Sequence, residues 1–207
     1  MRVKINKTTQ PIRSQSDRDA LASYFWNRNL RDYALFIFGI YTGRRISDLV
    51  RLNVGDVAFM DKKGRFTIRE RLVIQEKKTS KFINLVIAPQ ARRALSKYLK
   101  RRRNFSLSLG TFFQEPLFRS QKARRSGDFR ITQEHAWYVL TKAARECGLT
   151  YKIGTHSLRK TFGYMLYNKG VSIEVIQKAL NHSSAAITLA YIGITQDDID
   201  SAILSLD

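Results

Sequence analysis

Six side chains in this sequence form a set that could open a phosphodiester bond without a metal ion. A tyrosine oxygen can attack phosphorus, and guanidinium groups can neutralise the charge that builds on the phosphoryl oxygens. Histidine and lysine can carry the protons. The candidates, in chain order, are Arg45, Lys78, His156, Arg159, His182 and Tyr191.

The spacing of these residues suits a shared phosphate. His156 precedes Arg159 by three residues, one helical turn, so both can face the same oxygen atoms. Arg45 stands in Thr42-Gly-Arg-Arg45, and Asp48 follows it by three, so we expect Asp48 to hold the guanidinium of Arg45. Two arginines are adjacent here. The neighbours Gly43 and Asp48 favour Arg45 as the phosphate ligand, and the resemblance set out below implies the same choice.

The proton carriers can be assigned provisional roles. We expect His156 to accept the tyrosine proton, because the ordinary pKa of histidine lies in the working range. We expect His182 to donate a hydrogen bond to a non-bridging oxygen. Lys78 lies in a turn with Lys77 and Lys81, either of which remains an alternative proton donor for the leaving oxygen. The third histidine, His135, has no motif around it and is interpreted as structural.

The ordered set resembles the tyrosine recombinases, or phage-integrase-type recombinases, from about residue 14 to 193. Thr42-Gly-Arg-Arg45, His156-Ser-Leu-Arg159 and Leu180-Asn-His182 occur in the family's order, with Tyr191 nine positions after the last histidine. The resemblance implies a site-specific recombinase that forms a 3′-phosphotyrosyl link, with no cofactor. Two alternatives share the fold: a catalytically silent DNA-binding protein and a type IB topoisomerase-like relaxing enzyme.

The chain also differs from most of the family. Where this sequence has Arg44, most members have an apolar residue. Most members also carry an N-terminal helical domain, which has no counterpart in the dozen residues before the first expected helix. The chain therefore resembles short members such as the fimbrial phase-variation invertases. Its Met1 favours a minimal recombinase over an excised catalytic domain.

Composition points to double-stranded DNA as the partner. The 207 residues carry a formal net charge of +20, which favours binding to a polyanion. One cysteine excludes an internal disulfide, and no metal-binding motif is visible. No segment resembles a signal peptide or a membrane span, so we expect a cytoplasmic protein. Besides Arg44, the residues expected to contact DNA are Lys77, Lys81, Arg92, Arg93, Lys100, Arg101, Arg124, Arg125 and Lys160.

The elements that must position these residues are mostly helices. Periodicity and capping residues predict helices near 30–41, 45–52, 89–103, 132–148, 156–170 and 172–180. A further helix is expected to start at Ser16, and another at Ser184 that carries Tyr191. Three β-branched and aromatic runs between Arg65 and Ala88 predict one small antiparallel sheet, with Lys78 in the turn before its last strand. The fold class is thus mainly α with a small antiparallel sheet, as in a tyrosine recombinase catalytic domain.

We divide the sequence into three parts: a basic N-terminal arm at 1–13, a catalytic domain at 14–194 and a tail at 195–207. The tail carries four aspartates and no lysine or arginine. Its Ile199, Ile203 and Leu206 recur at helical spacing, so a short amphipathic helix is expected. In similar recombinases this region docks on a neighbouring protomer. We expect a dimer or tetramer on DNA, with packing in cis as the alternative.

Overall fold

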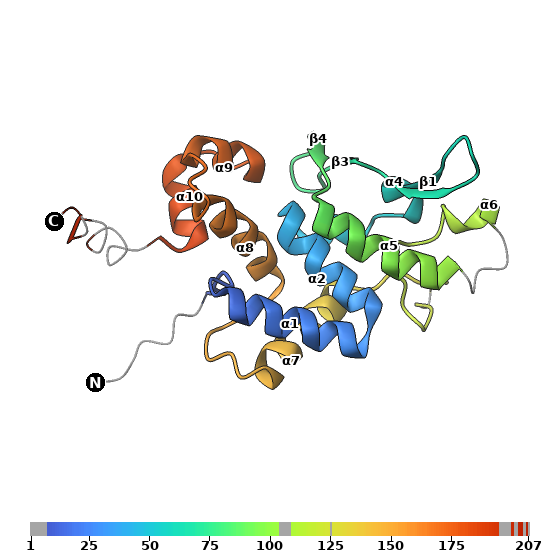
Figure 1. Ribbon diagram of the computed structural model, residues 1–207, viewed down its shortest axis with the longest axis horizontal. Coiled ribbons are helices and arrows are strands. Elements are labelled where there is room, and N and C mark those ends of the chain that lie inside the picture. The colour runs from blue at the N-terminus through green and yellow to red at the C-terminus, as the bar shows by residue number, and fades with distance from the viewer. Residues whose placement is uncertain are drawn as a thin grey trace.

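The computed structural model describes residues 8–103, 109–124, 126–194, 200, 203, 204 and 206. Helices dominate it, and two short β-hairpins lie beside one end of the helical body (Figure 1). The expected fold class is confirmed, although the β-structure differs in detail.

Helix α2 (Leu30–Thr42) is the central element, and its side chains are buried along most of its length. It packs against α1 (Gln15–Arg28), α5 (Pro89–Arg103) and α8 (Thr155–Tyr167). The Asn29 side chain accepts a hydrogen bond from the Arg31 N–H and caps its start. Gly43 ends it with φ of 62°, in the left-handed region that glycine adopts without strain. The chain therefore turns sharply just before Arg44 and Arg45.

The predicted single sheet is two separate hairpins. Strand β1 (Ala58–Met60) pairs with β2 (Phe66–Ile68), and β3 (Arg71–Gln75) pairs with β4 (Phe82–Val86), both antiparallel. The sequence did not reveal β1, because three residues directly after α4 (Val54–Val57) are too few to show an alternating pattern. Lys78 lies in the turn before β4, as predicted.

Several helix faces and caps are confirmed by the structure. On α5 the buried residues are Ala91, Ala94, Leu95, Tyr98 and Leu99, the apolar face that the sequence indicates. Thr132 caps α7 (Gln133–Glu146), and Ser172 and Ser184 precede α9 (Ile173–Leu180) and α10 (Ala185–Ile192). Two further short helices are α3 (Ile46–Leu49) and α6 (Leu109–Phe112).

Helices α8, α9 and α10 form a unit with its own small core. Ile176 and Leu180 of α9 and Ile192 of α10 are buried together beside α8. Gly163 permits this contact, because a Cβ atom there would lie 2.6 Å from Cγ2 of Ile192. Helix α10 therefore lies close against α8, and Tyr191 on α10 is brought toward the start of α8.

Residues 9–13 pack against this unit. Ile12 is fully buried, and its N–H donates to Oγ1 of Thr161 on α8 at 2.8 Å. The Arg13 guanidinium donates to the Gly193 carbonyl at the end of α10. The segment that leads into α1 thus contacts both α8 and α10.

Much of the expected tail helix, including Ile199, falls outside the described residues. Ile203 and Leu206 are described, and their side chains are exposed at 59% and 83%. Within the described part of the chain, no helix combines the length and the apolar character needed to cross a membrane.

Candidate active site

Arg159 is the most deeply buried of the candidate phosphate ligands, with 2% of its surface exposed. Its Nη1 donates to the Gly43 carbonyl at 2.7 Å, and its Nη2 donates to the Leu180 carbonyl. These carbonyls lie at the ends of α2 and α9. Arg159, which belongs to α8, therefore joins three helices at one point.

Arg45 lies beside Arg159, at the N-cap position just before α3. Together with Lys78 and His156 they line a cavity of about 370 Å³; the remaining lining residues are Ile46, Ser47, Lys77, Gln133 and Thr155. Nη1 of Arg45 is buried and makes no hydrogen bond to any described residue. That nitrogen lies 3.1 Å from a carboxylate oxygen of Glu76, whereas the Arg45 side chain as a whole is 19% exposed, so the rest of the guanidinium can meet a phosphate oxygen in the cavity.

Tyr191 lies at the edge of this group. Its hydroxyl is 3.5 Å from Nδ1 of His156, and its ring meets the ring of His182 edge-on, with centroids 4.8 Å apart. Burial raises the pKa of Tyr191, while the charges of Arg159 and Arg45 act in the opposite direction. The hydroxyl therefore stays protonated near neutral pH and needs a base to become a nucleophile.

Both nearby histidines are neutral at that pH. Burial and the charges of Arg159 and Lys160 lower the pKa of His156. Burial and the charges of Arg159 and Arg45 lower the pKa of His182 to about 4. Nδ1 of His182 is 3.1 Å from Oγ1 of Thr188, a contact that the sequence did not indicate. His156 is thus available as a proton acceptor, and Thr188 fixes the ring of His182.

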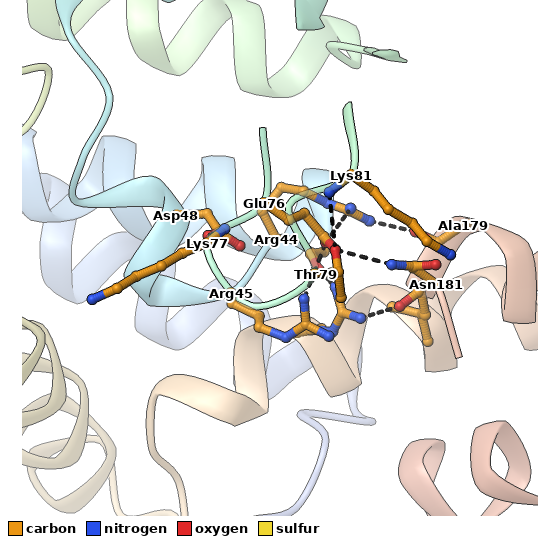
Figure 2. Close-up of polar contacts among 12 residues, drawn as sticks. Arg44, Arg45, Asp48, Glu76, Lys77, Thr79, Lys81, Ala179 and Asn181 are labelled. Carbon is orange, nitrogen blue, oxygen red and sulfur yellow. Dashed lines mark hydrogen bonds and ion pairs between the residues drawn. The ribbon is translucent and has the colours of Figure 1, made fainter. Parts of the chain in front are cut away.

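Glu76 is a residue of this site that sequence reasoning missed. Its side chain is fully buried, with Oε1 3.1 Å from Nη1 of Arg44 and 3.1 Å from Nη1 of Arg45. Oε2 accepts hydrogen bonds from Thr79 at 2.8 Å and Asn181 at 3.0 Å (Figure 2). The sequence did hold a signal. Glu76 continues the inward-facing register of Leu72 and Ile74, and a buried carboxylate needs partners.

The prediction that Arg44 contacts DNA is wrong. Arg44 is 2% exposed, and it donates to Oε1 of Glu76, to the Thr42 carbonyl at 3.1 Å and to the Ala179 carbonyl. The turn at Gly43 directs this side chain inward, where its hydrogen bonds replace water. Of the two adjacent arginines, only Arg45 lines the cavity.

Asp48 does not hold Arg45 as predicted. Its Oδ1 accepts a hydrogen bond from the backbone N–H of Lys77 at 3.0 Å, and Glu76 is the carboxylate beside Arg45. The short helix α3 carries Asp48 toward the β3–β4 turn instead. Asp48 therefore ties α3 to the start of the lysine-bearing turn.

The lysines separate into two groups. Lys77 and Lys78 both line the cavity, whereas Lys81 is not among its lining residues. Lys160 lies over the ring of Tyr191, with its Nζ 5.2 Å from the ring centroid. His135 lies outside the site, with its Nε2 2.7 Å from Nη2 of Arg31.

The other basic residues expected to contact DNA are dispersed. Arg124 lines a second cavity, which shares Ser47, Lys77 and Gln133 with the first. Arg92 and Arg101 line two further cavities that share no residue with the first. Arg93 and Lys100 are exposed on α5, and Arg125 lies outside the described residues.

This fold and this set of residues define a DNA breaking and rejoining enzyme of the tyrosine type, and comparison with known proteins agrees. Residues 15–197 match the model of the phage integrase family. The chain is 38% identical to the probable integrase/recombinase YoeC of Bacillus subtilis over 193 residues, which covers 93% of this chain and 94% of YoeC. It is 34% identical to the tyrosine recombinase XerD of Corynebacterium glutamicum, covering 83% of this chain but 51% of XerD.

Solved structures share the fold. A crystal structure of XerA recombinase superposes with a TM-score of 0.70 at 22% identity, covering 99% of this chain and 69% of XerA. A post-cleavage complex of XerH with its difH substrate gives a TM-score of 0.66 at 19% identity, covering 96% of this chain and 53% of XerH. The chain belongs to the phage integrase family and is a tyrosine-type site-specific recombinase.

The different surroundings of the two adjacent arginines predict different effects of substitution. Arg44→Ala leaves a buried carboxylate with one partner fewer, so we expect a loss of about 3–5 kcal/mol in the free energy of unfolding. Arg45→Ala also removes a charge beside Glu76, but this side chain is 19% exposed and its Nη1 makes no hydrogen bond to the carboxylate, so the stability loss is smaller. Its main effect is the loss of a preorganised donor, so DNA cleavage falls by about 100- to 1000-fold. Urea unfolding and single-turnover cleavage measure the two effects, with Arg145→Ala, in the exposed last turn of α7, as the control. Equal stability losses in Arg44→Ala and Arg45→Ala contradict this assignment.

Proposed function

We propose that this recombinase cleaves each DNA strand with Tyr191 and stores the broken bond as a 3′-phosphotyrosyl ester. The observation that carries this proposal is the tyrosine hydroxyl 3.5 Å from Nδ1 of His156, beside a cavity lined by Arg45 and Arg159. The family to which the chain belongs supports the same reaction.

The chemistry follows from the positions of these groups. Neutral His156 takes the proton of Tyr191, and the tyrosine oxygen forms a bond to phosphorus while the bond to the 5′ oxygen breaks. Arg45 and Arg159 stabilise the added negative charge, and His182 donates a hydrogen bond to a non-bridging oxygen. Lys78 gives a proton to the departing 5′ oxygen. The reverse reaction, in which a new 5′-hydroxyl attacks the phosphotyrosyl ester, rejoins the strands without an external energy source.

The path of the DNA is proposed from the basic residues around the two cavities that share Ser47, Lys77 and Gln133. The second of these cavities, about 480 Å³, is also lined by Arg51, Arg124 and Arg130. Asp128 lies within 3.2 Å of Nη1 of Arg130 and 3.7 Å of Nη1 of Arg124, which holds the two arginines together. Such a basic surface suits the phosphates on one side of the scissile position. Integration, excision and inversion all use this same strand-transfer chemistry. We place the protein in the cytoplasm, where the DNA is.

We propose a catalytic domain at residues 14–194, preceded by an arm at 1–13 and followed by a tail at 195–207 that packs on a neighbouring protomer. The described tail residues Ile203, Leu204 and Leu206 are exposed in the single chain, and an exposed apolar stripe calls for a partner. A related fold occurs in a lambda integrase tetramer bound to a Holliday junction, which supports a tetramer of this chain on paired sites.

A nicked DNA substrate tests the nucleophile. With the nick close to the scissile phosphate, the wild-type protein should remain attached to the 3′ end, because the short 5′ fragment diffuses away. Tyr191→Phe lacks the attacking oxygen and should form no adduct while binding DNA normally, and Tyr164→Phe serves as the matched control. Adduct formation by Tyr191→Phe, seen on a denaturing gel, would falsify the assignment.

The pH dependence of cleavage tests the base. Because the pKa of His156 is lowered, the imidazole stays neutral as the pH falls, and the rate is lost only as the pH passes below 6.5, the ordinary histidine value. The measurement is the apparent second-order cleavage rate at subsaturating protein, which reports the free protein. His156→Gln should lose this acid limb together with most of the rate. An acid limb above pH 6.5 in the wild type is incompatible with His156 as the base.

Removing the tail tests its packing. A chain that ends at Ile194 should bind an isolated half-site normally, because the residues around the cavities remain. It should lose cooperative binding to paired sites and strand exchange, because the contact between protomers is gone. Ile203→Ser/Leu206→Ser is the milder companion variant, and gel-shift titration on one and two sites measures both. Unchanged cooperativity in the truncated chain supports packing in cis.

A further inference from the structure

Glu76 contacts residues from three segments that form the site, yet it has no place in the proposed reaction. Each of its two oxygens has two partners. Oε1 faces the two arginines that follow α2, and Oε2 faces the β3–β4 turn and the end of α9 (Figure 2). One buried carboxylate therefore contacts three segments that lie far apart in the sequence.

The first of these contacts fixes the turn that carries the lysines. Oγ1 of Thr79, the residue after Lys78, donates to Glu76 at 2.8 Å. The backbone of Glu76 also closes the turn, because its N–H donates to the Lys81 carbonyl and its carbonyl accepts from the Ser80 N–H. The position of Lys78 relative to the cavity thus depends on Glu76.

The second contact fixes the residue before His182. Asn181 ends α9 in the left-handed conformation, with φ of 50°, and its side-chain amide donates to Oε2 of Glu76 at 3.0 Å. Holding Asn181 in this conformation determines the direction in which the chain leaves α9. His182 then reaches both Thr188 and the ring of Tyr191.

The third contact balances charge. Arg44 and Arg45 are adjacent, and Arg45 must keep its guanidinium turned toward the cavity. Burial alone would raise the pKa of Glu76, but the hydrogen bonds from Thr79 and Asn181 and the charges of Arg45 and Arg44 lower it below its ordinary value. Glu76 is therefore ionised near neutral pH and attracts both guanidinium groups.

We propose that Glu76 is a positioning residue that holds Arg45, the Lys78 turn and the His182 segment in register around the scissile phosphate. This inference rests on the proposed function, since it assumes that Lys78 protonates the 5′ oxygen. The inference also predicts which hydrogen bond of Glu76 affects protonation of the leaving 5′ oxygen. A loss of the Glu76–Thr79 hydrogen bond should appear as a defect in leaving-group protonation, and a loss of the Glu76–Asn181 bond should not.

A substrate with sulfur in place of the bridging 5′ oxygen separates these defects, because a thiolate departs without a proton. Thr79→Val keeps the shape of the side chain and removes the donor to Glu76. It should slow cleavage of ordinary DNA by on the order of 10- to 100-fold, as expected when a hydrogen bond to a charged group is lost. The 5′-thio substrate should restore most of that rate. Thr67→Val, the same change on β2, should cleave both substrates at the wild-type rate.

Three companion variants complete the test. Lys78→Ala should be rescued by the 5′-thio substrate, Asn181→Ala should be slow on both substrates, and Glu76→Gln should be slow and only partly rescued. If Lys78→Ala is not rescued, the lysine assignment and this inference fail together. If Lys78→Ala is rescued while Thr79→Val is not, Glu76 does not position the turn, and only this inference is overturned. Because Thr79 is only partly buried, its variant should fold even if Glu76→Gln does not.

Discussion

The site depends on holding three arginine side chains together in a space that admits little water. Arg44 and Arg159 are each 2% exposed, and Arg45 lines the cavity together with Arg159. Burial, together with repulsion from Arg44 and Arg45, lowers the pKa of Arg159 to about 10, still far above neutral pH. Such a cluster is costly to form unless its charges are hydrogen-bonded and opposed.

Backbone carbonyl groups at two helix ends and one carboxylate offset the energetic cost of burying these arginines. The last carbonyl groups of a helix lack intrahelical donors and carry the negative end of the helix dipole. Here Arg159 and Arg44 bond carbonyls at the end of α2 and at the end of α9, and Glu76 supplies the opposing charge. The same bonds fix the relative positions of the helices. Arg45 is paired with Glu76 on one side and lines the cavity on the other, where it can meet the anionic substrate.

Features set by local sequence could be predicted from the chain, and features set by distant contacts could not. Caps such as Thr132 and Ser184 and the apolar face of α5 act within one helix, so the pattern of residues reveals them. The roles of Arg44 and Asp48 depended on where Gly43 and the β3–β4 turn direct the chain. The sequence favoured Arg45 over Arg44 as the phosphate ligand, but it did not reveal that Arg44 is buried.

The β-structure illustrates the same limit. Strand type was predicted for three runs, but how strands pair depends on contacts between segments, and the split into two hairpins was missed. The burial of Glu76 could have been predicted from the sequence, because alternation along β3 assigns it to the buried face with Leu72 and Ile74. The identity of its partners, on α9 and at the end of α2, required the folded structure.

The central claim is that these elements converge to let Tyr191 attack a phosphate, and mapping the covalent linkage tests it most directly. The adduct with nicked DNA would be digested with protease and nuclease, and the modified peptide identified by mass spectrometry. The account predicts a nucleotide joined through its 3′-phosphate to Tyr191, with a free 5′-hydroxyl on the released strand. A nucleotide on any other residue, or a link through the 5′ end, would contradict it.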